Sequence, residues 1–227
     1  MIMTNRIITL FAGTVLPLPV LFYTLHMVKK TVAAAAAEGA GAPWLFANRA
    51  AGTIAAVFVS LTGAIAACRL VDAGAPALVQ VKLGIAFMVL LASAVYDSRF
   101  RTIPNVLPLI LVLARALILA GEFVSGAAPV PHLISSIAGA LAAAGTLAAA
   151  SKLTKGGVGA GDVKLIAAIG FMCGLYAVFA VLLLAVLSCA ITAVPLLLTK
   201  RKTISGNLPF APFIYIGMAA VISFSLY

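Results

Sequence analysis

Long apolar stretches separated by short polar segments form the main pattern of this chain. They lie at about 7–28, 51–68, 75–96, 106–120, 133–150, 163–198 and 208–226. A helix needs roughly 17–25 apolar residues to cross a bilayer, so each of the shorter stretches predicts one membrane span. The stretch 163–198 is long enough for two spans, and Gly174 is the expected break between them.

This pattern predicts an all-α fold, a polytopic membrane bundle of about eight transmembrane helices. The stretches are continuously apolar, whereas the strands of a membrane barrel alternate apolar and polar positions. Two helices and a short loop form an N-terminal part, 1–74, and six helices form a core, 75–227. Small residues at 135–151 permit close helix packing. Composition agrees with this class, because 64% of residues are hydrophobic and 9% are charged, against about 25% charged in soluble domains.

The net charge of +10 comes from bases beside the predicted spans. In the eight-span topology, eleven of the fifteen Lys and Arg residues lie on one side of the membrane, which marks that side as cytoplasmic. Bases in such positions contact anionic lipid. We therefore expect a lipid partner and no nucleic acid. Lys82 and Arg115 lie inside spans, where they either extend to the interface or pair with groups that the sequence does not locate.

Asp97 ends the third stretch, in the motif Asp-Ser-Arg-Phe-Arg-Thr-Ile-Pro-Asn at 97–105. The chain has only five acidic residues, and ionisable groups at membrane depth are functional-site candidates by default. Pro104 disfavours helix at the residue before it, which ends the span near Asp97. For this aspartate alone, the alternative is an interfacial acid neutralised by Arg99 or Arg101.

Asp162 follows a glycine-rich loop, Gly-Gly-Val-Gly-Ala-Gly at 156–161. Gly159 and Gly161 free the backbone and allow another chain to approach Asp162 closely. A phosphate-binding loop does not fit, because the Gly-Lys-Ser/Thr ending is missing and no strand precedes the loop. The alternative here is a loop whose acid complements a helix dipole.

Two spans separate Asp97 from Asp162, so the span count places both aspartates on one side of the membrane. Carboxyl groups held close together share a proton and titrate as a unit. One can take a proton from water while the other donates to a peptide carbonyl, which is aspartic-protease chemistry. His26 and His132 lie near the ends of predicted spans, so we expect both to be interfacial side chains. The three cysteines are widely spaced, so no metal site is expected, and no cofactor.

The motifs at 97–105 and 159–165 closely resemble those of the type IV prepilin peptidases, membrane aspartic proteases of the Gly-x-Gly-Asp class. The sequence Pro-Phe-Ala-Pro-Phe at 209–213 is similar to the segment before the last helix of that family, so the resemblance covers about 80–227. It implies a multi-pass enzyme of the bacterial inner membrane. Such an enzyme removes the short basic leader of type IV or Flp-type prepilins, or of pseudopilins, on the cytoplasmic side.

The resemblance also implies roles for particular residues. Asp97 and Asp162 correspond to the catalytic pair. The residues that shape the loops or contact the substrate are then Gly159, Gly161, Lys164, Pro104 and Asn105.

The chain departs from the larger members of that family in one loop. Those proteins carry two CxxC pairs that resemble a zinc site linked to N-methylation of the mature pilin, whereas the corresponding loop here, 29–50, has no cysteine. The sequence therefore supports neither a zinc site nor methyltransferase activity. Two other functions remain open, a different intramembrane aspartic protease of the signal-peptide-peptidase type and a transporter. Transporters place acids near the bilayer midplane in matching halves, whereas these acids lie at span ends.

Overall fold

The structure is a computed structural model that describes residues 77–126, 129–154, 157–198, 209–224 and 226. The chain divides into two units, Met1–Ala75 and Pro76–Tyr227, and the described residues all belong to the second. The predicted spans at 7–28 and 51–68 lie outside them, as does the loop 29–50. The division into 1–74 and 75–227 therefore stays a prediction.

The described residues form six α-helices and no strand, which confirms the all-α prediction. The helices are α5 (Ala77–Phe100), α6 (Val106–Ser125), α7 (Pro129–Leu153), α8 (Ala160–Cys173), α9 (Leu175–Leu198) and α10 (Ala211–Ser223). Four of them, α5, α6, α7 and α9, are long and apolar enough to cross a membrane, whereas α8 and α10 have 14 and 13 residues. The protein is a helical, multi-pass membrane protein. The count of eight spans stays a prediction.

The end of α6 differs from the predicted span in a way that matters. The apolar pattern ends the span at about 120, but the helix continues to Ser125. It stops at Gly126, which has a φ of 69° and whose N–H bonds the carbonyls of Glu122 and Phe123, as a left-handed glycine cap does. Glu122 therefore lies beyond the approximate end of the predicted span but within the helix. This acid lies on a membrane helix.

The predicted break within 163–198 is confirmed at Gly174. This residue has a φ of 91°, a conformation that glycine adopts without strain, and it separates α8 from α9. A Cβ at this position would lie 2.7 Å from the hydroxyl oxygen of Ser135 on α7. The close approach of α7 therefore adds a second reason for glycine here.

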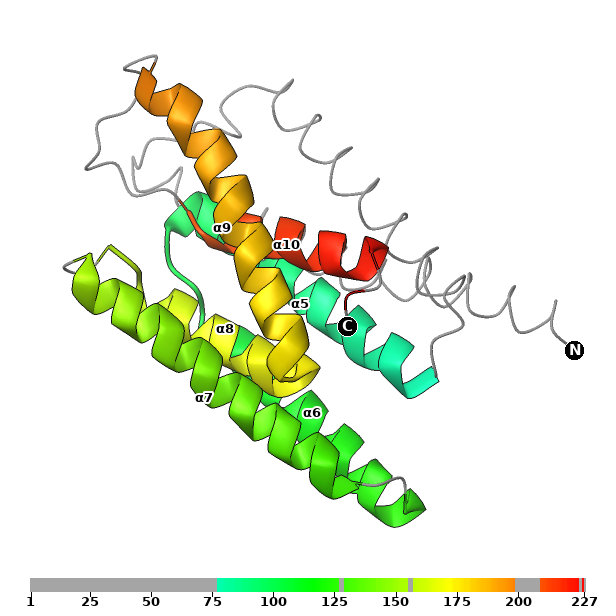
Figure 1. Cartoon of the computed structure of the whole chain (residues 1–227). Coiled ribbons are helices and arrows are strands. Elements are labelled where there is room, and N and C mark those ends of the chain that lie inside the picture. Colours follow the sequence, from blue (N-terminus) through cyan, green and yellow to red (C-terminus); the bar gives the residue numbers. More distant parts are fainter. Residues whose placement is uncertain (1–76, 127–128, 155–156, 199–208, 225, 227) are drawn as a thin grey trace, which may run out of the picture. The chain divides into compact units, whose positions relative to one another are not determined.

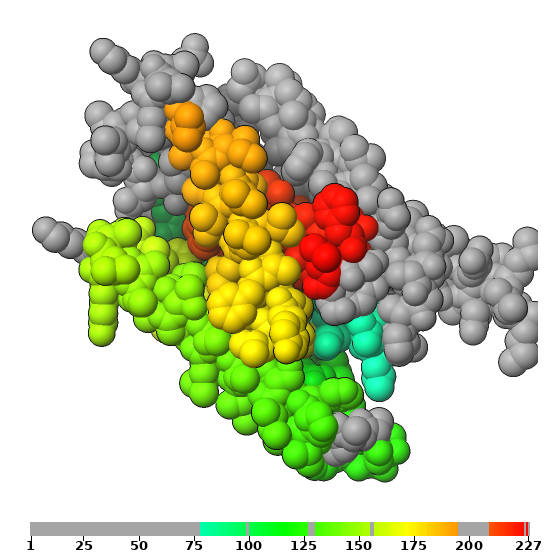
Figure 2. Space-filling view, viewed as in Figure 1, coloured from blue at the N-terminus to red at the C-terminus, as the bar shows by residue number. Residues whose placement is uncertain are grey.

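Helix α8 has the most neighbouring helices in the described unit (Figure 1). Helix α5 packs against α6, α8 and α10, and α8 packs against α5, α6, α7 and α9. In the space-filling view, α7 and α9 take most of the near face, and α5 shows only at its edge (Figure 2). The exposed side chains of α7 and α9 include Leu141 and Leu183, as expected of helices whose outer faces contact lipid.

Helices α7 and α8 are in backbone contact at Gly139 and Gly170. A Cβ on Gly139 would lie 2.5 Å from the carbonyl oxygen of Gly170, and a Cβ on Gly170 would likewise meet the carbonyl of Gly139. No side chain fits at either position. The small residues of 135–151 thus allow the close packing that they predicted, and this contact fixes the helix that carries Asp162.

Candidate functional site

Asp97 lies in the last turn of α5 and contacts the start of α10. Its Oδ2 accepts a hydrogen bond of 3.0 Å from the backbone N–H of Ala211, and the residue is only 5% exposed. Ala211 is the first residue of α10. A helix N-terminus has free N–H groups and a partial positive charge, so it stabilises an ionised carboxylate. The segment 209–213 therefore supplies a hydrogen-bond donor to Asp97.

Asp162 is the third residue of α8, whose N-cap is Gly159. The backbone of Gly159 donates a hydrogen bond to the carboxylate, as happens when an acid at this helix position reaches back to the cap. A Cβ on Gly159 would lie 3.1 Å from Oδ2 of Asp162, so glycine leaves room for the carboxylate. The other oxygen, Oδ1, is buried, and it has no hydrogen-bond partner among the described residues.

The two carboxyl groups interact electrostatically. Asp162 lies outside the four long apolar helices. The pKa of Asp162 is raised to about 6, mainly by burial and also by the charge of Asp97, while the Gly159 hydrogen bond opposes the rise. Helix α5 packs against α8, so Asp97 and Asp162 lie near enough for one charge to influence the other.

A neutralising arginine, the alternative for Asp97, finds little support among the described residues. Arg101 acts on Asp97 electrostatically, but its side chain is exposed and no ion pair joins the two within the part of the chain that the structure describes. The side chain of Arg99 lies outside that part. The contacts of Asp97 are therefore mainly with the N-terminus of α10.

Two contacts connect the loop after α5 to the start of α8. A Cβ on Gly161 would lie 3.2 Å from the Cβ of Ile103, so the loop packs directly on this glycine. The Nζ atom of Lys164 donates a hydrogen bond of 3.0 Å to Oδ1 of Asn105, which is the N-cap of α6. The two segments therefore meet at one end of the helices. One carries the predicted site residues Gly161 and Lys164, and the other carries Pro104 and Asn105.

Sequence reasoning missed two contributors to this site. The donor at Ala211 is a backbone N–H group, which has no side-chain signature, although the segment 209–213 was singled out as a motif. Ile103 is an apolar residue like many others in the chain. Among the residues that the structure covers, no three His, Cys, Asp or Glu side chains gather as a metal site requires.

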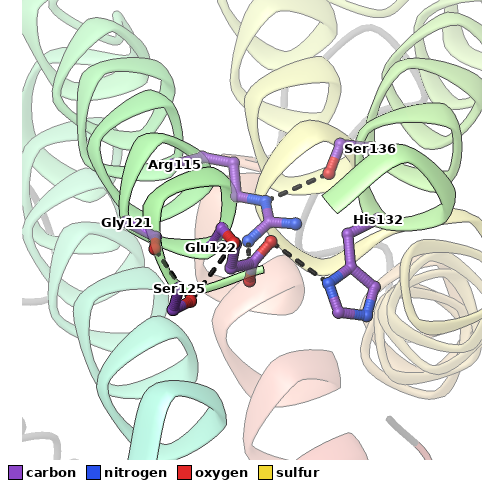
Figure 3. A network of polar contacts seen from close by, with 6 residues as sticks. All are labelled: Arg115, Gly121, Glu122, Ser125, His132 and Ser136. Atoms are coloured by element: carbon purple, nitrogen blue, oxygen red, sulfur yellow. Dashed lines mark hydrogen bonds and ion pairs between the residues drawn. The ribbon is translucent and has the colours of Figure 1, made fainter. Parts of the chain in front are cut away.

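A second polar cluster lies far along the same helices (Figure 3). Arg115 of α6 donates to Oε1 of Glu122 at 3.1 Å and to the hydroxyl of Ser136 on α7 at 3.0 Å. The Nδ1 atom of His132 on α7 lies 3.1 Å from Oε2 of Glu122. Lys82 of α5 acts on this group electrostatically. The partner of Arg115, which the sequence did not locate, is thus Glu122.

The length of α6 separates the cluster around Glu122 from the site around Asp97 and Asp162. Val106, which follows Asn105, and Glu122 are about 24 Å apart along α6, at 1.5 Å per residue. Arg115 and Glu122 are 3% and 6% exposed. His132, predicted as an interfacial side chain, lies near the start of α7 with 53% of its side chain exposed.

Residues 84–194 match the model of the type IV leader peptidase family. The matched stretch includes both aspartate motifs, Asp97 with its Ile-Pro-Asn continuation and Asp162 with its glycine loop. Over this stretch, just under half of its length, the chain is similar to the type IV leader peptidase family. Its Pro-Phe-Ala-Pro-Phe segment lies beyond the matched residues.

A curated relative agrees with this similarity. The chain is 38% identical over 131 residues to a protein of Bacillus subtilis (strain 168) named "Prepilin leader peptidase/N-methyltransferase". The alignment covers 56% of this chain and 49% of the relative, so the chain spans about half the length of the curated protein that it matches. No solved structure matches it significantly.

Proposed function

We propose that the protein is a membrane aspartic endopeptidase that removes the short basic leader of type IV or Flp-type prepilins, or of pseudopilins. The observation that carries this proposal is the meeting of Asp97 and Asp162, with an unpartnered, buried oxygen on Asp162. Perturbed, coupled acids are typical of catalytic sites, where each protonation state has a task. Similarity to the family supplies the substrate class.

The chemistry follows from two carboxyl groups that share one proton. The ionised group takes a proton from water, and the water oxygen attacks the scissile carbonyl carbon. The protonated group donates to the carbonyl oxygen, which stabilises the tetrahedral intermediate. When this intermediate collapses, the C–N bond breaks and the leaving amine takes up a proton. Gly159 and Gly161 keep bulk away from Asp162, so that an extended substrate backbone can lie beside it.

The location and the partners follow from the same proposal. We place the protein in the bacterial inner membrane with both aspartates on the cytoplasmic side, because the predicted excess of bases lies there. A prepilin leader is itself basic, so the basic face of the enzyme does not attract it directly. Anionic lipid holds both molecules at the same surface.

Methyltransferase activity is not part of this proposal. The curated relative carries that activity in its name, but the loop 29–50 of this chain lacks the cysteines of the larger family members. The transporter alternative is also weakened. That alternative used the two aspartates together with Lys82 or Arg115 on an ion path, whereas Arg115 is held in a buried ion pair with Glu122.

Co-expression with a candidate prepilin, in a bacterial host that lacks its own prepilin peptidase, tests the proposal. We expect leader removal by the wild-type chain, and a loss of roughly 10²- to 10⁴-fold in Asp97→Asn and in Asp162→Asn. Blotting of the membrane fraction establishes that each variant inserts. Normal cleavage by either inserted variant contradicts the assignment. Cleavage of signal-peptide remnants in place of prepilins supports the other protease.

A further inference from the structure

The two carboxyl groups of the proposed pair have different surroundings. Oδ2 of Asp97 accepts the N–H of Ala211 from another helix. Within the described part of the chain, Asp162 receives a hydrogen bond from its own helix cap, Gly159, and its Oδ1 is buried without a donor. A shared proton therefore has two unequal sites available to it.

The contact with α10 favours a negative charge on Asp97. Ala211 is the first residue of a 13-residue helix, so its N–H belongs to the free donors at the positive end of the helix dipole. A carboxylate that accepts a backbone N–H is stabilised in its charged form. Burial of Asp97, 5% exposed, works against its charge, and the donors at the start of α10 offset that cost.

The environment of Asp162 favours the opposite state. A buried carboxylate oxygen without a donor loses its hydration and receives nothing in return, which costs free energy in the charged form. A protonated carboxyl group avoids that cost, and its O–H can donate to a substrate. Oδ1 is therefore the natural site for the shared proton.

We infer that the pair is asymmetric: Asp97, positioned by the Ala211 N–H, takes the proton from water, and Asp162 donates its proton to the scissile carbonyl oxygen. This inference rests on the proposed function. Among the described residues, the charged groups that act on either carboxyl group are the other carboxyl group and Arg101. Lys164 instead contacts Asn105.

The proton transfers balance over one turnover. Water gives a proton to Asp97 and its oxygen bonds to the carbonyl carbon, while Asp162 gives its proton to the carbonyl oxygen, which produces a neutral gem-diol. One hydroxyl of the gem-diol then returns a proton to Asp162. Asp97 protonates the amine nitrogen as the C–N bond breaks. The products are a carboxylic acid and an amine, and the pair is back in its starting state.

Infrared spectroscopy of the purified, lipid-reconstituted protein tests the asymmetry, because the chain has only five acidic residues. At about pH 5, below the pKa of about 6 for Asp162, we expect a protonated-carboxyl band of one group in wild type and in Asp97→Asn. The band is expected to disappear in Asp162→Asn, with the double variant as baseline. Burial, the larger cause of the raised pKa, persists when Asp97 is replaced.

A band that disappears in Asp97→Asn and persists in Asp162→Asn overturns the inference, as do equal bands in both variants. The measurement reads protonation without turnover. A chain that cleaves prepilins but shows equal bands refutes the asymmetry alone, whereas a chain that does not cleave them refutes the proposed function.

Replacement of Ala211 tests its positioning role. Proline is tolerated at the first position of a helix and has no N–H, so Ala211→Pro removes the larger of the two backbone donors to Asp97 and leaves that of Phe210. We expect the acidic limb of the kcat–pH profile to move upward by roughly one pH unit. Ala211→Gly keeps the N–H and is expected to leave that limb in place, whatever its effect on the rate. An unmoved limb in inserted Ala211→Pro contradicts the role, and the infrared result does not depend on this variant.

Discussion

Glu122 and Asp162 show two ways in which a membrane protein holds an acid. Each oxygen of Glu122 has a partner, Arg115 at Oε1 and His132 at Oε2. Asp162 has a buried oxygen without one among the described residues, and it interacts with a second acid, Asp97. Buried polar groups are normally satisfied, so an unsatisfied one needs an explanation. The comparison fits a stabilising role for Glu122 and the catalytic role that we propose for Asp162.

The cluster around Glu122 connects helices rather than loops. Arg115 and Glu122 lie on α6, whereas Ser136 and His132 lie on α7. The contacts between them therefore join the two helices. A charge inside a membrane protein is tolerated when a partner compensates it. Removal of one partner leaves the other buried and unpaired, which costs more than the pair contributes.

The largest effect on stability is expected from Arg115→Met. This change leaves Glu122 buried without its cation, and we expect the free energy of unfolding to fall by on the order of 3 kcal/mol. Chemical or thermal unfolding in detergent measures it. The double variant Arg115→Met/Glu122→Leu removes both charges and is expected to recover most of the loss. A double variant less stable than Arg115→Met contradicts a simple paired role for Glu122.

The pH dependence of cleavage distinguishes the two acids next. Asp162 must be protonated to donate, and burial together with Asp97 raises its pKa to about 6. The value of kcat/KM is therefore expected to fall as pH rises above about 6, approaching tenfold per pH unit. Steady-state cleavage of a leader peptide across pH measures this fall. A rate that keeps increasing through pH 8, roughly two units above that value, would exclude Asp162 as the acid.

A smaller effect is expected at the contact between the two loops. Gly161→Ala places a Cβ 3.2 Å from the Cβ of Ile103, so the loop must shift by a few tenths of an ångström beside Asp162. Misplacement on this scale reduces catalysis, here by several-fold, since geometry contributes strongly to rate. Gly145→Ala is the matched control, because its Cβ would meet nothing within 4 Å. Equal rates for the two variants would mean that this contact does not position Asp162.

Much of this site was visible in the sequence because acids are scarce in it. Asp97 and Asp162 are two of five acidic residues, and each lies in a distinctive motif at the end of an apolar stretch. The break at Gly174 was also readable, because 163–198 is too long for one span. These signals come from local composition and length, which the sequence contains directly.

Other features depend on contacts between distant segments. The apolar pattern ends the predicted span at about 120, whereas the helix continues through Glu122 to Ser125. The pairing of Glu122 with Arg115 could not be seen without that helix end. The N–H of Ala211 reaches Asp97 across 114 positions of sequence, and a backbone donor carries no residue-specific signal.

The most direct test compares Asp162→Asn with Glu122→Gln in both stability and cleavage. The pKa of Asp162 is raised from 3.8 to about 6 in the folded protein, so the stability contributed by its protonation is present below about 3.8 and lost as pH rises through about 6. We therefore expect Asp162→Asn to be more stable than wild type at neutral pH, without this gain near pH 3.8, and unable to cleave. Glu122→Gln is expected to be less stable and still able to cleave wherever it remains folded. The account is contradicted if Asp162→Asn is destabilised and cleaves normally while folded Glu122→Gln is inactive.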